Sequence, residues 1–295
     1  MFKPLLLLLL LSSVAVCSQA QYYFYDDKYM DNDMLFEAGL SLGLMQGVTD
    51  VGTRKGNAIN PSFYDWKSAK PNIGLHCTFM YKSTFEGRLQ LTKGTIAGKD
   101  ANSNSNFVKQ RNLSYKSNIF ELSLTAAIHP VMLLNIDYLP AVSPYILAGI
   151  GVFSFYPKAQ YKGEWVALRA QNTEGQNSEQ YPARKQYSLR AMSYPLGGGF
   201  KYEYSGILNF RFEALYRFTS SDYLDDASTI YVAKSIFPTS QQLILAHRYL
   251  ELYPNQNRTG RARASAGDKD HFFTLNLMAG YVFGREKRKY GGRTR

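Results

Sequence analysis

Cysteine is nearly absent from the 295-residue sequence. It has two cysteines, Cys17 and Cys77. Cys17 falls within an N-terminal stretch that we predict to be removed, so Cys77 is the only cysteine of the mature chain. An intramolecular disulfide is therefore excluded, and a disulfide-stapled secreted fold with it.

Long apolar runs are missing beyond residue 20. No stretch of eighteen apolar residues follows that point, which excludes a transmembrane helix in the mature chain. A soluble secreted protein and a β-barrel remain.

Histidine is also scarce, with His76, His129, His247 and His271 as the full set. None has metal-ligand spacing, and neither a His-Glu-x-x-His nor a Gly-x-Ser-x-Gly pattern occurs. The sequence therefore predicts no catalytic residues, no metal site and no cofactor. A lipid-modifying enzyme with a histidine at the barrel rim stays open as a third hypothesis.

The first twenty residues have the pattern of a secretory signal peptide. Lys3 precedes an unbroken leucine run at residues 5–11, and small residues lead to Ala20. This pattern predicts cleavage before Gln21 and export. The alternative, a lipoprotein beginning at Cys17, is disfavoured because the branched Val16 precedes that cysteine.

Aromatic residues are abundant, with 23 Tyr and 18 Phe, while the mean hydropathy is below zero. Outer-membrane barrels combine these features because only alternate residues face lipid and aromatic girdles mark both interfaces. The net charge of +11 would suggest nucleic acid, but export argues against that partner. Part of the excess lies in a basic tail, residues 285–295, which is either solvated or bound to an anionic surface.

Alternation of apolar and polar residues recurs in eight segments of the length that a tilted strand needs to cross a bilayer. It predicts an all-β, antiparallel, up-and-down transmembrane barrel of eight strands. The segment at 145–155 is the least regular, and Gly149 and Gly151 indicate its inner side. The predicted strands are residues 36–44, 73–81, 85–92, 120–128, 145–155, 196–204, 208–218 and 273–283.

The connections alternate in length. Tight turns at Ser83 and Gly206, and a modest link at 129–142, alternate with long links at 45–71, 94–117, 156–190 and 219–270. Short periplasmic turns and long extracellular loops are typical of outer-membrane barrels. We therefore expect a signal peptide at 1–20, a periplasmic segment at 21–34, the barrel at 35–284 and a periplasmic tail at 285–295. Residues 229–237 leave room for one further hairpin.

Charged residues occupy the predicted inner face, where acids and bases must largely neutralise one another because unpaired buried charge is too costly. An eight-stranded barrel is just wide enough for side chains to fill, so we expect a plugged, non-conducting interior. The predicted inner network comprises Glu37, Glu86, Arg88, Glu121, Lys201, Glu203, Arg211, Glu213 and Arg217.

Two other clusters have a functional and a structural interpretation. Gly197 to Gly199 suggest a phosphate loop, but no helix with a following Lys-Ser or Lys-Thr pair is predicted, and relief of crowding in a narrow barrel fits better. Asp222, Asp225 and Asp226 are suited either to cation binding or, more commonly, to turn formation.

Three stretches resemble the PorG-like outer-membrane barrels of Bacteroidetes, a family related to the type IX secretion and gliding machinery. These are residues 36–43, which resemble the opening strand, residues 143–151, which resemble a central strand, and a loop motif after the seventh strand. The most distinctive part of that motif is Asp222, Tyr223, Leu224, Asp225 and Asp226. The resemblance implies a non-enzymatic barrel that contacts a periplasmic ring built from a lipoprotein and its partner.

The leading hypothesis is thus an accessory barrel of type IX secretion, embedded in outer-membrane lipid and contacting that ring. The runner-up is a surface adhesion or ligand-binding barrel that uses its long extracellular loops.

Overall fold

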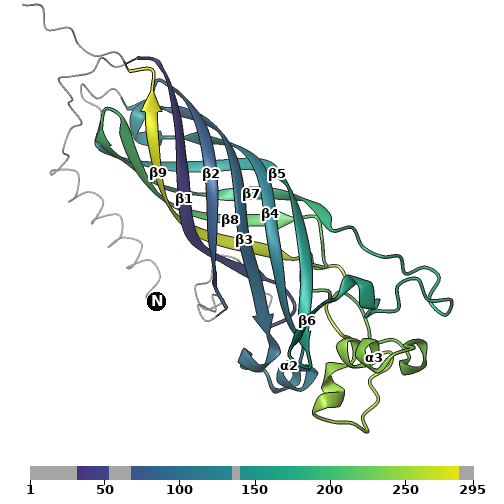
Figure 1. Ribbon diagram of the computed structural model, residues 1–295. Coiled ribbons are helices and arrows are strands. Elements are labelled where there is room, and N and C mark those ends of the chain that lie inside the picture. The colour runs from purple at the N-terminus through teal and green to yellow at the C-terminus, as the bar shows by residue number, and fades with distance from the viewer. Residues whose placement is uncertain (1–31, 53–67, 135–139, 286–295) are drawn as a thin grey trace, which may run out of the picture.

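The computed structural model describes residues 32–52, 68–134 and 140–285. Eight of its strands pair antiparallel in chain order, and the pairing of the last with the first closes a barrel (Figure 1). The predicted fold is therefore confirmed. The barrel strands are β1 (Met34–Val48), β2 (Lys70–Tyr81), β3 (Phe85–Lys99), β4 (Ser114–Ile128), β5 (Val142–Tyr161), β7 (Arg190–Ser205), β8 (Leu208–Thr219) and β9 (His271–Phe283).

Shorter elements lie outside the ring. β6 (Glu164–Ala167) pairs only with the far end of β5, and the stretch considered for a further hairpin contains one isolated bridge, Ile230 to Ala262. No helix within the described residues is long and apolar enough to cross a membrane. The helical elements are η3 (Asp100–Asn102), α2 (Asn106–Arg111), η4 (Pro130–Leu133), η5 (Arg169–Gln171), η6 (Lys234–Ile236), α3 (Ser240–Ala246) and η7 (Arg248–Glu251).

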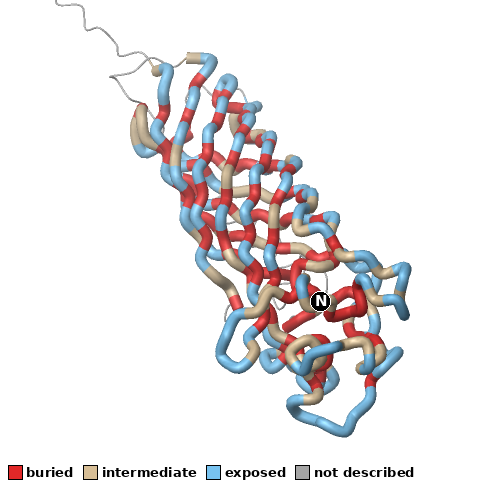
Figure 2. Tube along the Cα trace, turned by 45° about the vertical axis from the view of Figure 1, so that its right-hand side comes forward, coloured by how far each residue is buried: buried red, intermediate tan, exposed pale blue. Residues whose placement is uncertain are grey.

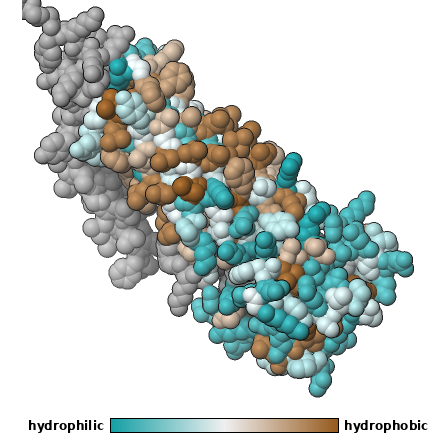
Figure 3. All heavy atoms as spheres, in the orientation of Figure 1, coloured by the Kyte–Doolittle hydropathy of each residue, from teal (hydrophilic) through white to brown (hydrophobic). Residues whose placement is uncertain are grey.

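Successive residues of each strand alternate between the barrel interior and its outer surface (Figure 2). The outer surface carries an apolar belt (Figure 3), aliphatic at mid-height and aromatic towards both ends. A belt of this kind around a polar interior suits lipid outside and paired charges inside, so the chain has the fold of an outer-membrane barrel. Exposed belt residues include Leu40, Leu75, Leu124, Ile150, Leu196 and Leu277 at mid-height, Phe36, Tyr81, Phe85, Tyr202 and Tyr281 at one end, and Phe120, Tyr156, Tyr194 and Phe218 at the other.

The two ends of the barrel differ in their connections. At one end β2 and β3 are joined by a tight turn in which Lys82 and Ser83 both have positive φ, and β7 and β8 are joined at Gly206. This turn geometry matches the right-handed twist of a hairpin. The start of β1 pairs with the finish of β9 at the same end. By the asymmetry typical of such barrels, this end is periplasmic and the long connections are extracellular.

Several strands extend past the predicted bounds at the extracellular end. There the polarity reverses: inward-facing positions become apolar, as at Ile96, Tyr115 and Phe153, while outward ones become polar, as at Lys99 and Lys116. The alternation continues, but its apolar residues change face, so the predicted strands stopped at the membrane boundary.

Glycines fit where backbones approach closely. Gly149 and Gly151 face the interior, as predicted. A Cβ at Gly197 would lie 2.1 Å from the carbonyl oxygen of Ala214, so the cluster at 197–199 permits strand packing in β7. The predicted signal peptide, residues 21–31 and the tail from residue 286 lie outside the described residues.

Candidate functional site

The barrel interior near the periplasmic end is built around Glu37 and Arg211. Arg211 donates one guanidinium hydrogen bond to Glu37 and another to Glu86 at 3.0 Å. The amide of Asn209 donates to Glu37 at 2.7 Å, and His76 Nε2 lies 3.1 Å from the same carboxylate. Four strands, β1, β2, β3 and β8, thus supply one connected cluster.

Arg88 and Glu213 form the next layer. Arg88 donates to Glu213 at 2.5 Å and to Glu86 at 3.3 Å. The hydroxyl of Tyr145 donates to the same Glu213 oxygen at 2.8 Å. The layer therefore joins β3, β5 and β8 across the lumen.

Glu121 and Arg217 close the extracellular side of the network. Arg217 Nε donates to Glu121 at 2.6 Å, and Ser193 donates to the other carboxylate oxygen at 2.6 Å. Arg217 also donates to Thr274 Oγ1 at 2.7 Å. Both charged side chains are fully buried.

Lys201 and Glu203 lie nearest the periplasm, with 3.1 Å between Lys201 Nζ and the carboxylate. Glu203 also accepts from Arg285 at 2.9 Å. All nine predicted inner-face residues thus lie inside the barrel, and Arg285, which the sequence pattern placed in the tail, joins them. Five acids then face five bases, which satisfies the requirement that buried charge be paired.

A serine, a histidine and a glutamate meet in the same interior. His129 Nδ1 lies 2.7 Å from Ser143 Oγ, and His129 Nε2 lies 3.0 Å from Glu86. Nucleophilic catalysis uses this order of groups. Ser143 is only 1% exposed, however, and Glu86 already pairs with Arg211, so the arrangement is best explained as part of the interior network.

Three of the long extracellular connections fold together into a compact cap over the barrel mouth, which we define as residues 100–113, 162–189 and 220–270 (Figure 1). The cap encloses an apolar core together with the extended ends of the strands. This core includes Met45, Ile96, Tyr115, Phe153, Phe155, Leu168, Leu224, Leu245 and Phe272.

The loop motif at 222–226 holds the cap together. Asp225 accepts from the backbone of Val51 and of Ala227, both at 2.9 Å, and Asp222 accepts from Ser228 at 2.6 Å. Tyr223 stacks on Tyr187 with 4.5 Å between ring centroids, and Leu224 is fully buried. The motif therefore has a structural role in this chain.

Asp226 is the most enclosed acid of the motif. It accepts from Thr173 at 2.5 Å and from Tyr187 at 2.6 Å, with Arg263 at 3.6 Å. Burial raises its pKa to about 6 in spite of these contacts. No group of three or more His, Cys, Asp or Glu side chains in the described residues could hold a metal ion, so turn and scaffold formation is the interpretation the structure favours.

His247 lies in the cap between aromatic rings. Its ring stacks on Tyr231 at 5.3 Å and meets Phe237 edge-on at 5.5 Å. Burial, with Arg263 and Lys234 nearby, lowers its pKa to about 4. A neutral histidine in an aromatic core is a packing residue rather than a general base.

A buried ion pair positions α2. Arg111, at the end of this helix, donates two hydrogen bonds of 2.8 Å to Asp100 and a third, of 2.7 Å, to the carbonyl of Arg263. Bidentate pairing of this kind fixes orientation as well as contributing energy. It ties α2 to the loop at 256–263.

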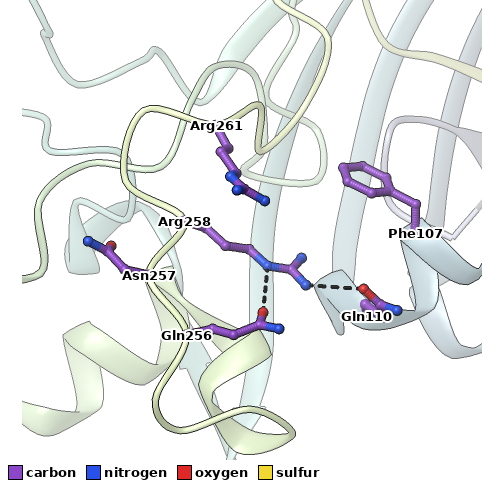
Figure 4. Close-up of a pocket in the computed structure, with 6 residues that line it drawn as sticks. All are labelled: Phe107, Gln110, Gln256, Asn257, Arg258 and Arg261. Carbon is purple, nitrogen blue, oxygen red and sulfur yellow. Dashed lines mark hydrogen bonds between the residues drawn. The ribbon is translucent and has the colours of Figure 1, made fainter.

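A cavity of about 270 Å³ lies between α2 and that loop. Figure 4 shows the guanidinium ends of Arg258 and Arg261 lying toward Phe107 and Gln110 of α2. Arg258 is 7% exposed and stacks 4.8 Å from the Tyr249 ring, and its side-chain hydrogen-bond partners are the amide oxygens of Gln256 and Gln110. In the part of the chain that is described, it has no ion pair with a carboxylate.

The sequence did not indicate Arg285, Ser143 or this cavity as sites. Ser143 and His129 lie at a strand entry and in a link, outside the regular alternation. Arg258, Arg261 and Arg263 form a basic stretch in the sequence, but the contact of Arg258 with α2 joins residues about 150 positions apart.

No family model matches the sequence, and no curated protein matches it. Solved structures similar to this chain include Neisserial surface protein A, at 7% identity and a TM-score of 0.39 over 85% of this chain and 98% of that one. The attachment invasion locus protein of Yersinia pestis has 11% identity and a TM-score of 0.36 over 84% and 99%. Outer membrane protein OprG from Pseudomonas aeruginosa has 10% identity and a TM-score of 0.37 over 88% and 99%. With likeness this low, the fold assignment rests on the strand pairing and the outer belt.

Proposed function

We propose that this protein is a sealed, non-enzymatic outer-membrane barrel that works by contact with other macromolecules, as an accessory component of the type IX secretion machinery. The observation that carries the first part is the filled interior. Five acids and five bases pair across the lumen, and the cap covers its extracellular mouth. A filled lumen favours anchoring or recognition over the passage of solutes.

The assignment to type IX secretion is supported by the likeness of residues 36–43, 143–151 and 222–226 to the PorG-like barrels. The ring contacted by such a barrel lies in the periplasm. Exposed residues at the periplasmic end, such as Lys82 in the β2–β3 turn and Leu133 and Leu134 at the end of η4, are available for that contact.

Site-specific photocrosslinking in native outer membranes tests this proposal. A photoreactive amino acid placed at Lys82 is expected to capture the periplasmic ring lipoprotein or its partner, identified by mass spectrometry. The matched control places it at Lys269, which is exposed in the extracellular cap. Capture of neither ring protein from any exposed periplasmic position would contradict the proposal.

One observation favours a second candidate, a surface ligand-binding barrel. Arg258 is a nearly buried cation that has no carboxylate partner among the described residues, and it lies beside the exposed Arg261 and the ring of Phe107. Paired arginines are suited to bidentate contact with carboxylate or sulfate oxygens, and an aromatic ring offers a face for a sugar. The cavity therefore suits an anionic saccharide.

Calorimetric titration of the purified protein with glucuronic acid, glucose 6-sulfate and glucose tests this candidate. Binding of the two anions but not of glucose, lost in Arg261→Gln and retained in Lys269→Gln, is the expected pattern. Equal behaviour of the two variants would exclude the cavity as the site.

A further inference from the structure

Outward-facing basic residues gather on one side of the barrel, near the extracellular ends of β3, β4, β5 and β7. The strand register aligns Lys93, Phe120, Ser154 and Arg190 in one row across these four strands. Two residues further up β4 and β5 from that row lie Asn118 and Tyr156, and two further again lie Lys116 and Lys158, directly opposite one another. The four cations therefore lie on neighbouring strands of one face.

The height of Lys93 matches the outer edge of the apolar belt. Lys93 is eight residues along β3 from Phe85 of the periplasmic aromatic end. At about 3.4 Å per residue and a tilt of about 40°, that interval spans roughly 21 Å of membrane normal. Since the apolar band of such barrels is about 25 Å tall, Lys93 lies where lipid headgroups begin.

The carboxylates of the described residues do not neutralise the charges of this group. In the described ranges, no ion pair joins Lys93, Lys116, Lys158 or Arg190 to a carboxylate. Lys116 and Lys158 face each other across a strand pair, an arrangement that destabilises a sheet unless an anion lies between or beside them. We therefore expect these four cations to bind an external anion.

Aromatic rings hold two of these cations at the boundary. Lys116 lies 5.5 Å from the Trp165 ring and Lys158 lies 5.1 Å from the Tyr156 ring. Such contacts fix a lysine beside an interfacial aromatic side chain while leaving its ammonium open to a ligand.

The row also borders a cavity. A hollow of about 260 Å³ lies between Lys93 on one side and Arg190 on the other, with Phe120 and Tyr156 among its lining residues. It forms where β7 begins its ladder with β5 at Arg190 and Ser154, while β5 continues upward. A cation at each side and apolar walls between them suit a ligand with a phosphate and an apolar body.

We propose that this basic face is a binding site for a phosphate-bearing lipid of the outer leaflet. Lys93 and Arg190 contact the headgroup phosphates. Lys116 and Lys158, which lie further from the membrane, neutralise negative charge on the outer part of the same headgroup. The cavity receives an apolar part of the lipid. The site is independent of the proposed secretion role, because it depends on the outer wall of the barrel and not on the periplasmic turns.

Native mass spectrometry of the full chain in detergent, titrated with lipid A and with its dephosphorylated form, tests the site. The unaltered protein is expected to retain lipid A and to lose the dephosphorylated form at much lower collision energy. Each juxtamembrane cation contributes about fivefold to the affinity for anionic lipid. The double variant Lys93→Gln with Arg190→Gln should therefore bind lipid A about 25-fold more weakly.

The matched control is Lys109→Gln with Lys162→Gln, two exposed cations beyond the belt, which should bind as the unaltered protein does. Heat-modified migration on a gel confirms that each variant is folded. Equal retention of the two lipid forms, an equal loss in the control variant, or full displacement by millimolar inorganic phosphate would each overturn the proposal.

Discussion

The transmembrane ring and the extracellular cap are two regions of one chain with opposite polarity. In the ring the interior is charged and the exterior apolar, as Arg211 and Leu40 illustrate. In the cap the interior is apolar and the exterior polar, as Leu224 and Lys269 illustrate. The same alternating strands run from the membrane into the cap. The medium outside the barrel, lipid or water, therefore determines whether polar or apolar side chains face inward.

The two regions are stabilised by different interactions. Lipid offers no hydrophobic gain for burying apolar side chains inside the ring, so its interior is specified by ion pairs and hydrogen bonds. The cap is surrounded by water, and burial of apolar area stabilises it. Removal of one buried charge should therefore lower the stability of the ring more than that of the cap. Removal of one large apolar side chain should lower the stability of the cap more than that of the ring.

The largest effect is expected for Glu121→Leu. It leaves Arg217 buried without a carboxylate, which should lower the free energy of unfolding by about 3–5 kcal/mol. The double variant Glu121→Leu with Arg217→Met should recover most of this loss, because no charge is left unpaired. Urea unfolding in lipid vesicles measures both, and a neutral single variant would refute the paired-interior account.

Leu224→Ala tests the cap in the same terms. Its side chain is fully buried, so truncation should cost about 2–5 kcal/mol of cap stability. Limited proteolysis should then cut the cap while the barrel keeps its heat-modified gel migration. Leu252→Ala, at a residue 51% exposed, is the control, and equal sensitivity of the two variants would count against a packed cap.

Low pH should change the stability of the cap in opposite directions through Asp226 and His247. The folded pKa of Asp226 is raised from 3.8 to about 6, so its contribution favours the folded cap at low pH and is lost as pH rises through 6. The folded pKa of His247 is lowered from 6.5 to about 4, so its contribution is present above 6.5 and is lost as pH falls towards 4. Each shift corresponds to about 3 kcal/mol.

Because the two effects oppose each other, their sum in the unaltered cap should change little between pH 4 and 6. Asp226→Asn should leave a cap that weakens in acid, and His247→Gln one that strengthens. Cap melting followed by proteolysis at several pH values measures this, and slopes of the same sign in both variants would contradict the assignment.

The smallest effect is expected at the start of α3. The Thr239 side chain accepts a hydrogen bond from the backbone of Gln242, and such N-caps contribute about 1 kcal/mol. Thr239→Ala should speed amide hydrogen exchange within Ser240–Ala246 and leave the barrel strands unchanged. Unchanged exchange in the helix would show that packing alone holds it.

The sequence predicted the ring well because lipid enforces one rule over its whole height. Every inner charge from Glu37 to Arg217 follows from period two and from the apolar identity of its neighbours. The extension of β3, β4 and β5 was missed for the same reason, since Tyr115 and Ile119 are apolar on the face that holds Glu121 and Ser123 below them. The alternation expected for a membrane strand has its apolar residues on the lipid-facing side. It therefore predicts that a strand ends where the apolar residues change to the inner side.

The cap was not predicted because its contacts join distant segments. Asp225 bonds to Val51, Arg111 bonds to the carbonyl of Arg263, and Arg258 reaches Gln110. No local periodicity encodes such pairs. The motif at 222–226 is visible in the sequence, but its structural role follows only from the contacts of the folded chain.

The sealed interior is tested most directly by ion conductance across a planar lipid bilayer containing the purified full-length chain. With five acids and five bases paired in the lumen and the cap folded over its mouth, we expect no steady current at any applied voltage. A steady open-channel current from the unaltered protein would contradict the sealed barrel, and with it the inference that this chain works by contact.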